Sequence, residues 1–132
     1  MPAPEKRQAD IRGSDIFNLM EFIDRSEGDL GLAREVARIF SNSAPGYVDA
    51  IRKAVTAGEA EAVQQSAHKL KGAAANLALP LLEESARMIE SLARSGNLEN
   101  VGLLLPELEQ RLAEALESLL QVLISPQGRA HC

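Results

Sequence analysis

Residues 60–77 read AEAVQQSAHKLKGAAANL, and this stretch decides the fold class. Its apolar residues recur every three or four positions, which is the period of an amphipathic α-helix. The stripe comprises Ala60, Val63, Ala67, Leu70, Ala74 and Leu77. Pro80 follows closely. Because proline suits the first turn of a helix and disrupts a helix interior, Pro80 predicts the end of this helix and the start of another.

The same period recurs on both sides of this stretch. Further apolar stripes run through residues 16–23, 36–55, 82–93 and 101–123. Gly28, Gly58 and Gly96 lie in the connections, and no long strand-like alternation occurs. Short connections between long amphipathic helices favour antiparallel neighbours. The sequence therefore predicts an all-α fold: an antiparallel up-down four-helix bundle with a short extra N-terminal helix.

Three residues bear on the helix boundaries. Ser14 is a favourable N-cap and predicts the start of the short first helix. Pro45 lies inside the stripe of residues 36–55, where it either kinks one helix or begins a second one. Pro106 raises the same question near the start of the last helix.

The composition fits a single domain. The chain has 132 residues, of which 45% are hydrophobic and 25% charged, as in an ordinary globular protein. Aromatic residues make up only 3%, so Leu, Ile, Val and Ala must build most of the core. We expect the bundle to cover residues 13–124, between two flexible polar tails at residues 1–12 and 125–132.

Charge and cysteine content narrow the partners and the compartment. The net charge of −5 argues against nucleic-acid binding, which requires a basic face. Cys132 is the only cysteine, so no internal disulfide can form. The first ten residues lack the apolar stretch of a signal peptide, and no segment approaches the roughly 18 apolar residues that span a bilayer. We expect a cytoplasmic protein without membrane contact.

Several classes of enzyme are excluded because their motifs are missing. The sequence contains no nucleotide-binding G-x-x-x-x-G-K-[ST] or G-x-G-x-x-G loop. His68 and His131 are the only histidines, so the repeated Glu-x-x-His pairs of a helical metal site are absent. Kinase, hydrolase and metal-enzyme functions therefore lack their essential residues, and we expect no bound metal.

His68 falls away from the apolar stripe at about 100° per residue, so we expect its imidazole on the solvent side of the helix. A neutral imidazole has one nitrogen with a free lone pair and can act as a nucleophile. Lys69 and Lys71 either form an ordinary solvated face or stabilise an anion at His68. Gly72, one turn later, either permits close helix packing or leaves the surface bare for another molecule. Together these residues favour transfer of an anionic group, most simply phosphoryl.

The segment Ala67–Leu77, AHKLKGAAANL, resembles the signature of histidine-containing phosphotransfer (HPt) domains. In that signature a histidine is followed by a basic residue, then Lys-Gly, small residues and an apolar position. Residues 40–58 and 82–94 also resemble this family, so the resemblance extends over roughly residues 14–124. One departure is Ala78, where the family usually has a glycine that helps to end the helix.

The resemblance implies a role for each residue of the site. His68 would accept the phosphoryl group through Nε2. Lys71 would stabilise that group and Lys69 would add positive potential, while Gly72 would clear space for the partner. Glu90 matches a Gln or Glu position whose side chain hydrogen-bonds the other imidazole nitrogen.

The neighbourhood of the histidine leaves alternatives for that hydrogen bond. Gln65 is a second candidate to orient the imidazole. Glu90 also lies four residues before Arg94, so the two could form an ordinary helical ion pair on the surface.

The resemblance also implies the partners. The donor would be the phospho-aspartate of a response-regulator receiver domain, or a hybrid or other sensor histidine kinase, and the acceptor would be another receiver. The chain would be a monomeric phosphocarrier without its own ATP-binding or kinase domain. It would need no cofactor of its own, since the receiver would supply Mg²⁺.

Two alternatives to phosphotransfer remain, one for the function of the chain and one for the role of His68. The chain could be a non-catalytic helical adaptor that binds a receiver or a kinase without exchanging phosphate. His68 could instead be a histidine satisfied inside the core, which requires it to point inward.

Overall fold

All regular structure in residues 13–124, the part of the chain that the computed structural model describes, is helical, which confirms the predicted all-α class. The elements are α2 (Gly13–Ile16), α3 (Leu19–Arg25), α4 (Leu30–Ala57), α5 (Ala60–Asn76), α6 (Pro80–Arg94), α7 (Leu98–Leu119) and the π-helical turn η1 (Leu120–Ile124). The expected tails, residues 1–12 and 125–132, lie outside the described residues. None of the described helices is both long enough and apolar enough to cross a bilayer.

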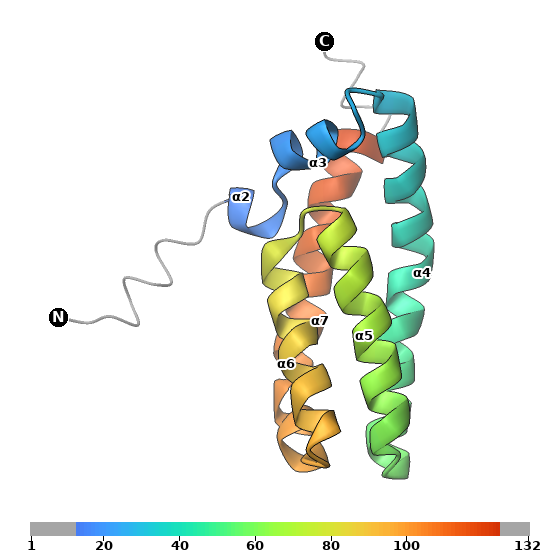
Figure 1. Cartoon of the computed structure of the whole chain (residues 1–132), viewed down its shortest axis with the longest axis vertical. Coiled ribbons are helices and arrows are strands. Elements are labelled where there is room, and N and C mark those ends of the chain that lie inside the picture. The colour runs from blue at the N-terminus through green and yellow to red at the C-terminus, as the bar shows by residue number, and fades with distance from the viewer. Residues whose placement is uncertain (1–12, 125–132) are drawn as a thin grey trace, which may run out of the picture.

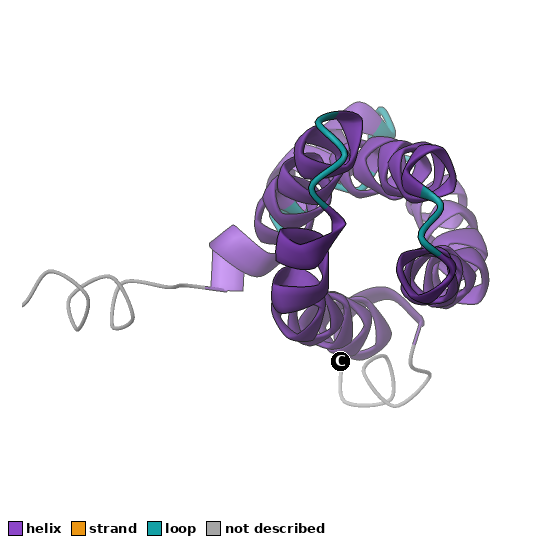
Figure 2. Ribbon diagram, turned by 90° about the horizontal axis from the view of Figure 1, so that it is seen from below, coloured by secondary structure: helices purple, strands orange, loops and turns teal. Residues whose placement is uncertain are grey.

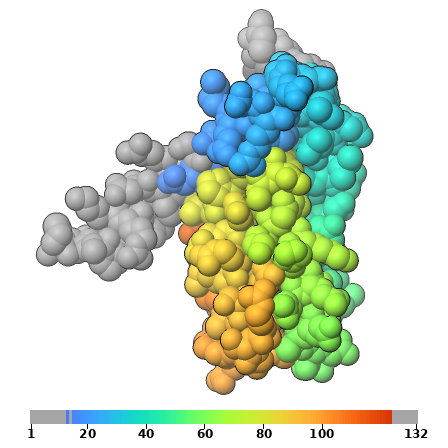
Figure 3. Space-filling model, viewed as in Figure 1, coloured from blue at the N-terminus to red at the C-terminus, as the bar shows by residue number. Residues whose placement is uncertain are grey.

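The four long helices form the predicted up-down bundle. Figure 1 shows α4 and α6 running in one direction and α5 and α7 in the other. In the end-on view the four helices surround a common centre (Figure 2). The helix α5 packs between α4 and α6, and α7 completes the ring against α6 and α4. The segment α2–α3 covers the end of the bundle where α5 joins α6 (Figure 3).

The core consists mainly of aliphatic side chains from the predicted stripes. Within α5 the buried residues are Val63, Ala67, Leu70 and Ala74. All three phenylalanines, Phe17, Phe22 and Phe40, are also buried. Each helix hides one face, as its three- and four-residue spacing requires, because removing apolar surface from water is the main force that drives folding.

Both internal prolines lie within continuous helices, so neither divides its helix. Pro45 is in the middle of the 28-residue α4, and Pro106 is in the 22-residue α7. A proline inside a helix costs about 3 kcal/mol relative to alanine. Both prolines are exposed, while Ala44 and Val48 on either side of Pro45 are buried in the core. Burial of the apolar stripe across the proline therefore maintains the helix.

The extra N-terminal helix differs from its prediction. Ser14 lies inside α2, which starts at Gly13, and the chain breaks between α2 and α3, so the segment is two short helices instead of one. The cap of α3 is Asn18, whose side-chain oxygen accepts a hydrogen bond from the Glu21 N–H at 3.0 Å. The Asn18 N–H donates to the Ala78 carbonyl at 2.8 Å. This contact joins the N-terminal segment to the α5–α6 connection, so tertiary packing moves the cap away from Ser14.

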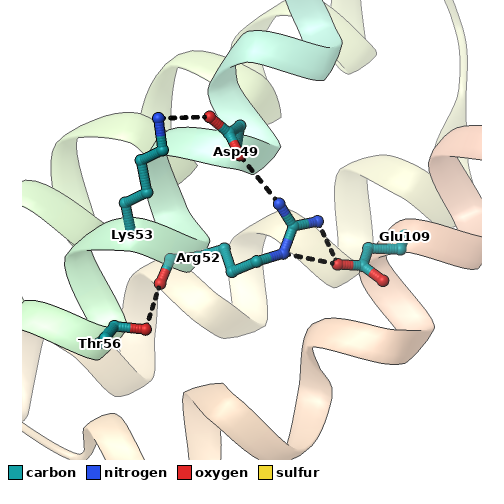
Figure 4. Close-up of polar contacts among 5 residues, drawn as sticks. All are labelled: Asp49, Arg52, Lys53, Thr56 and Glu109. Carbon is teal, nitrogen blue, oxygen red and sulfur yellow. Dashed lines mark hydrogen bonds and ion pairs between the residues drawn. The ribbon is translucent and has the colours of Figure 1, made fainter.

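An ion-pair cluster links the first and last helices of the bundle (Figure 4). Arg52 of α4 binds Glu109 of α7, with 3.2 Å between Nε and Oε2, and it also pairs with Asp49 at 3.0 Å. Lys53 pairs with Asp49 at 3.1 Å. Arg52, Asp49 and Glu109 are close to half exposed, so each pair contributes at most about 1 kcal/mol. The cluster supplements a bundle that the apolar core holds together.

The backbone at Ala78 explains why glycine is usual there in the related signature. Ala78 ends α5 with a φ of 58°, in the left-handed region that disfavours a Cβ atom. We expect Ala78→Gly to raise the free energy of unfolding by about 0.5 kcal/mol, because relief of strain outweighs the loss of a buried methyl group. Glu27 is exposed and has a φ of 56°, so Glu27→Gly should raise the free energy of unfolding by about 1 kcal/mol.

Urea denaturation of both variants checks this prediction. A loss of stability in Ala78→Gly together with a gain in Glu27→Gly would mean that methyl packing, and not strain, dominates at Ala78.

Candidate functional site

His68 lies in the middle of α5 on the side opposite the core. Its neighbours Ala67 and Leu70 are fully buried, whereas its own side chain is 66% exposed. This exposure excludes the alternative of a histidine satisfied inside the core. An exposed imidazole on a rigid helix can meet a second molecule without any rearrangement of the bundle.

One ring nitrogen of His68 contacts a buried carboxylate on the neighbouring helix. Nδ1 of His68 lies 2.9 Å from Oε2 of Glu90 in α6. Glu90 is only 4% exposed. An ionised carboxylate can only accept hydrogen bonds, so Nδ1 must carry the hydrogen and donate it. In the neutral ring this tautomer leaves the lone pair on Nε2, the nitrogen on the far side of the ring from Glu90.

Two cations complete the surroundings of Glu90. Nζ of Lys71 lies 2.8 Å from Oε1, and a guanidinium nitrogen of Arg94 lies 3.1 Å from Oε2. The hydrogen bond from Lys71 lowers the pKa of Glu90; burial opposes this, and the hydrogen bond to His68 adds to it. Glu90 is therefore a buried anion at neutral pH, held by one histidine and two cations.

The contact between Glu90 and His68 matches the geometry that the resemblance implies. The ion pair between Glu90 and Arg94 is also present, so the two alternatives coexist. The carboxylate of Glu90 in this pair is buried, however, whereas both partners of an ordinary surface ion pair are exposed. Gln65 lines the hollow beside the ring, but within residues 13–124 the hydrogen bond of His68 is made with Glu90 and not with Gln65.

The two lysines have different surroundings. Lys71 is 28% exposed in its side chain and is bound to Glu90, so its ammonium group is already paired. Lys69 is exposed and lines a hollow of about 510 Å³ beside His68. The other residues of this hollow are Glu61, Gln64, Gln65, Glu90 and Arg94. Lys69 therefore brings positive charge to the open side of the site, whereas Lys71 and Arg94 are both paired with Glu90.

Gly72 has no packing partner. It is exposed, and a Cβ atom added to it would meet nothing within 4 Å. The alternative that Gly72 permits close helix packing is therefore wrong. Nothing within the described fold requires glycine here, although glycine costs about 1 kcal/mol relative to alanine in a helix.

The apolar residues of the N-terminal segment separate into two groups. Phe17 and Phe22 are buried and pack against each other, with 5.8 Å between ring centroids. Met20 is 77% exposed. The phenylalanines therefore serve the core, and Met20 alone of the three faces outward.

Sequence reasoning missed the pairing of Lys71 with Glu90. A signal exists for the contact between His68 and Glu90, since each is eleven residues from Leu79, which lies between α5 and α6. Residues equally far from the connection of two antiparallel helices lie at the same height, since every residue adds the same rise of 1.5 Å. Lys71 lies three residues after His68 on the same face of α5, which brings it within reach of Glu90 as well.

Acid should weaken the fold through Glu90. The pKa of Glu90 is lowered in the folded state, so its ion pairs stabilise the protein above the unfolded value, near pH 4.3, and that stabilisation is lost as the pH falls through the folded value. We expect the wild type to exceed Glu90→Gln in free energy of unfolding at pH 6, and the difference to shrink by pH 3. Urea denaturation at several pH values measures this difference. A difference that stays constant with pH would contradict the prediction.

This bundle defines a class of protein: a helical domain that, within residues 13–124, exposes one imidazole on its surface. Comparison with known proteins identifies the class further. The Hpt domain family matches residues 35–123, more than half of the chain. The chain therefore belongs to the Hpt domain family, the histidine phosphotransfer domains of phosphorelays.

Relatives of known structure have the same fold. The crystal structure of histidine-containing phosphotransfer protein B (HptB) from Pseudomonas aeruginosa PAO1 is 22% identical, with a TM-score of 0.76 over 80% of this chain and 92% of that one. The HPT domain of the Hpt sensor hybrid histidine kinase from Shewanella is also 22% identical, with a TM-score of 0.74 over 83% of this chain and 95% of that one. At 22% identity, the similarity to these two structures shows a shared fold alone.

A sequence relative is the aerobic respiration control sensor protein ArcB of Escherichia coli O157:H7. It is 28% identical over 81 residues, which are 61% of this chain and 10% of ArcB. The matched region thus spans about a tenth of that relative.

Proposed function

We propose that His68 accepts a phosphoryl group from the phospho-aspartate of a receiver domain, or from a histidine kinase, and passes it to another receiver. One observation carries this proposal: the exposed imidazole donates through Nδ1 to the buried Glu90 and so keeps Nε2 free as a nucleophile. Family membership supports the reaction, and the geometry supports the choice of residue.

The proposed transfer is an in-line displacement. The Nε2 lone pair forms a bond to phosphorus while the bond from phosphorus to the aspartate oxygen breaks, and that oxygen keeps the electron pair. Such reactions depend on positioning and on electrostatic stabilisation of the phosphoryl oxygens. Lys69 lines the open side of His68 and would supply positive charge there, and Arg94 lies on the same side but is paired with Glu90. Lys71 would contribute mainly through Glu90, because its ammonium group is paired with that carboxylate.

The receiver would supply Mg²⁺. Glu90, the carboxylate beside His68, is buried and already accepts from His68, Lys71 and Arg94, so it has little capacity left for a metal ion. The chain would thus act as a phosphocarrier between partners. Its monomeric state and cytoplasmic location stay predictions from the sequence.

Transfer of label tests the proposal. A receiver domain phosphorylated with ³²P on its aspartate is incubated with the full chain and Mg²⁺, and the chain is then analysed for label. We expect label that acid removes and alkali does not, which is the behaviour of phosphohistidine, and mass spectrometry should map it to the peptide that contains His68. Binding of several receivers without any transfer would instead establish the non-catalytic adaptor.

A further inference from the structure

We propose that Arg94 is a switchable phosphoryl-binding residue: it pairs with Glu90 while His68 is unmodified, and its guanidinium turns to the phosphoryl group once His68 carries one. This inference rests on the proposed role of His68 as phosphoacceptor, and it adds a residue that recognises the modified state. The covalent step is the displacement described above, and only an ionic contact of Arg94 changes with it.

Arg94 and His68 meet at a single atom. Oε2 of Glu90 lies 2.9 Å from Nδ1 of His68 and 3.1 Å from a guanidinium nitrogen of Arg94. Both side chains also line the hollow of about 510 Å³. A group attached to the imidazole therefore enters the surroundings of a guanidinium that is only one shared oxygen away.

The side chain of Arg94 is bound loosely. It is 61% exposed, whereas the side chain of Lys71, the other cation on Glu90, is 28% exposed. An ion pair with an exposed side chain contributes at most about 1 kcal/mol. In the part of the chain that the structure describes, one guanidinium nitrogen of Arg94 contacts Glu90 and the others have no partner. Arg94 is also the last residue of α6, so no further turn of that helix follows it.

Glu90 remains paired when Arg94 leaves. Lys71 lies on the other carboxylate oxygen, with 2.8 Å between Nζ and Oε1. The pKa of Glu90 is lowered chiefly by the hydrogen bond from Lys71, burial opposes this, and His68 adds to the lowering. Departure of Arg94 therefore leaves an ionised carboxylate that still has its closest cation.

A phosphoryl group is a stronger partner for the guanidinium than Glu90. A phosphorylated side chain carries a charge of about −1.5 to −2 at pH 7, whereas Glu90 has a single charge that it shares with Lys71. The planar guanidinium matches two phosphoryl oxygens at once. Glu90 offers Arg94 only one oxygen. Phosphorylation should therefore draw Arg94 away from Glu90, and the modified state gains a contact that the unmodified state lacks.

A purely structural role for Arg94 predicts different effects. A cation in the last turn of a helix is favourable because the C-terminal end of the helix is negative. Loss of that role would lower the free energy of unfolding but would leave the distribution of phosphate between the partners unchanged. The equilibrium of phosphoryl transfer therefore separates the two roles.

The experiment measures the equilibrium between one phosphorylated receiver and the full chain, with Mg²⁺ present, for the wild type and Arg94→Gln. The matched control is Arg38→Gln. The side chain of Arg38 is 53% exposed and pairs with Glu35 at 2.9 Å, much as Arg94 pairs with Glu90. Arg38 lies on α4 and does not line the hollow beside His68, so its substitution removes the same charge elsewhere.

We expect Arg94→Gln to lower the equilibrium constant for phosphorylation of the chain about five- to tenfold, because a bidentate contact with a phosphoryl group is stronger than an exposed ion pair. Arg38→Gln should match the wild type. An unchanged constant for Arg94→Gln, as a structural role predicts, or a raised one would overturn the inference and leave the phosphoacceptor role intact. Absence of label from the wild type would instead count against the proposed function itself.

The ³¹P signal of the phosphorylated chain provides a second measurement, which a structural role would not change. A guanidinium beside the phosphoryl oxygens favours their doubly charged form and so lowers the pKa of the phosphoryl group. We expect the midpoint of the ³¹P titration to lie at higher pH in Arg94→Gln than in the wild type. Equal midpoints would overturn the inference.

Arg94→Lys covers the case in which Arg94→Gln does not fold, because lysine keeps the positive charge that pairs with Glu90. An ammonium group is a point charge and lacks the planar fork that binds two oxygens in parallel. We expect the equilibrium constant of Arg94→Lys to fall about two- to threefold. A wild-type value would overturn the inference.

Discussion

Replacement of His68 by glutamine should abolish phosphoryl uptake completely, because an amide nitrogen has no lone pair available to attack phosphorus. The fold should survive: the side chain is 66% exposed, and within residues 13–124 its one hydrogen-bond partner is Glu90. A single hydrogen bond of this kind contributes about 1 kcal/mol. Transfer from a ³²P-labelled receiver and urea denaturation of the same samples measure the two effects separately.

The control for this prediction is His131→Gln, at the only other histidine of the sequence. It should take up label as the wild type does. If His68→Gln retained label and His131→Gln lost it, the phosphoacceptor would have been assigned to the wrong histidine.

Substitution of Gly72 by glutamine should slow transfer by tenfold or more, which corresponds to a barrier increase of at least about 1.4 kcal/mol. Gly72 lies one helical turn from His68 on the exposed face, where side chains four residues apart are about 5–6 Å from each other. Reacting atoms must approach to about 3–3.5 Å. A side chain at residue 72 would occupy the surface over which the partner reaches Nε2.

The same substitution should stabilise the fold. A Cβ atom at residue 72 meets nothing within 4 Å, so Gly72→Gln should add about 0.5–1 kcal/mol to the free energy of unfolding through helix propensity. Stability and transfer would thus change in opposite directions, which separates steric interference from damage to the fold.

The matched control is Gly46→Gln. Gly46 is also an exposed glycine inside a long helix with no atom within 4 Å of an added Cβ, and it lies on the opposite side of α4 from buried Ala44 and Val48. It should raise stability similarly and leave transfer unchanged. Equal transfer rates in Gly72→Gln and Gly46→Gln would remove the case for Gly72 as the residue that gives a partner access.

The sequence by itself determined the helices and the exposure of His68. Both depend on the three- and four-residue spacing of apolar side chains, which fixes the buried face of each helix before any helix meets another. Val63, Ala67 and Leu70 define the core side of α5, and His68 must therefore face solvent. The same local rule predicted that Gly72 lies on the exposed surface.

Local patterns were less informative at the helix ends. Ser14 and Asn18 are both suitable caps, and the choice of Asn18 depends on its backbone contact with Ala78, sixty residues away along the chain. Pro45 interrupts the local hydrogen-bond pattern, but burial of the stripe on both sides keeps α4 continuous. In each case a contact formed in the folded bundle outweighed a local preference.

Only the tertiary structure decided what surrounds Glu90. The periodicity places Glu90 beside the apolar stripe of α6, but the axial register and rotation of α6 against α5 determine that its carboxylate meets His68 and Lys71 and is buried. A helix pattern fixes which face turns inward, whereas the pairing of side chains between helices depends on how whole surfaces pack. The sequence therefore identified the nucleophile and, through the family resemblance, named Glu90 as its partner, while the burial of that carboxylate and its pairing with Lys71 depended on the assembled bundle.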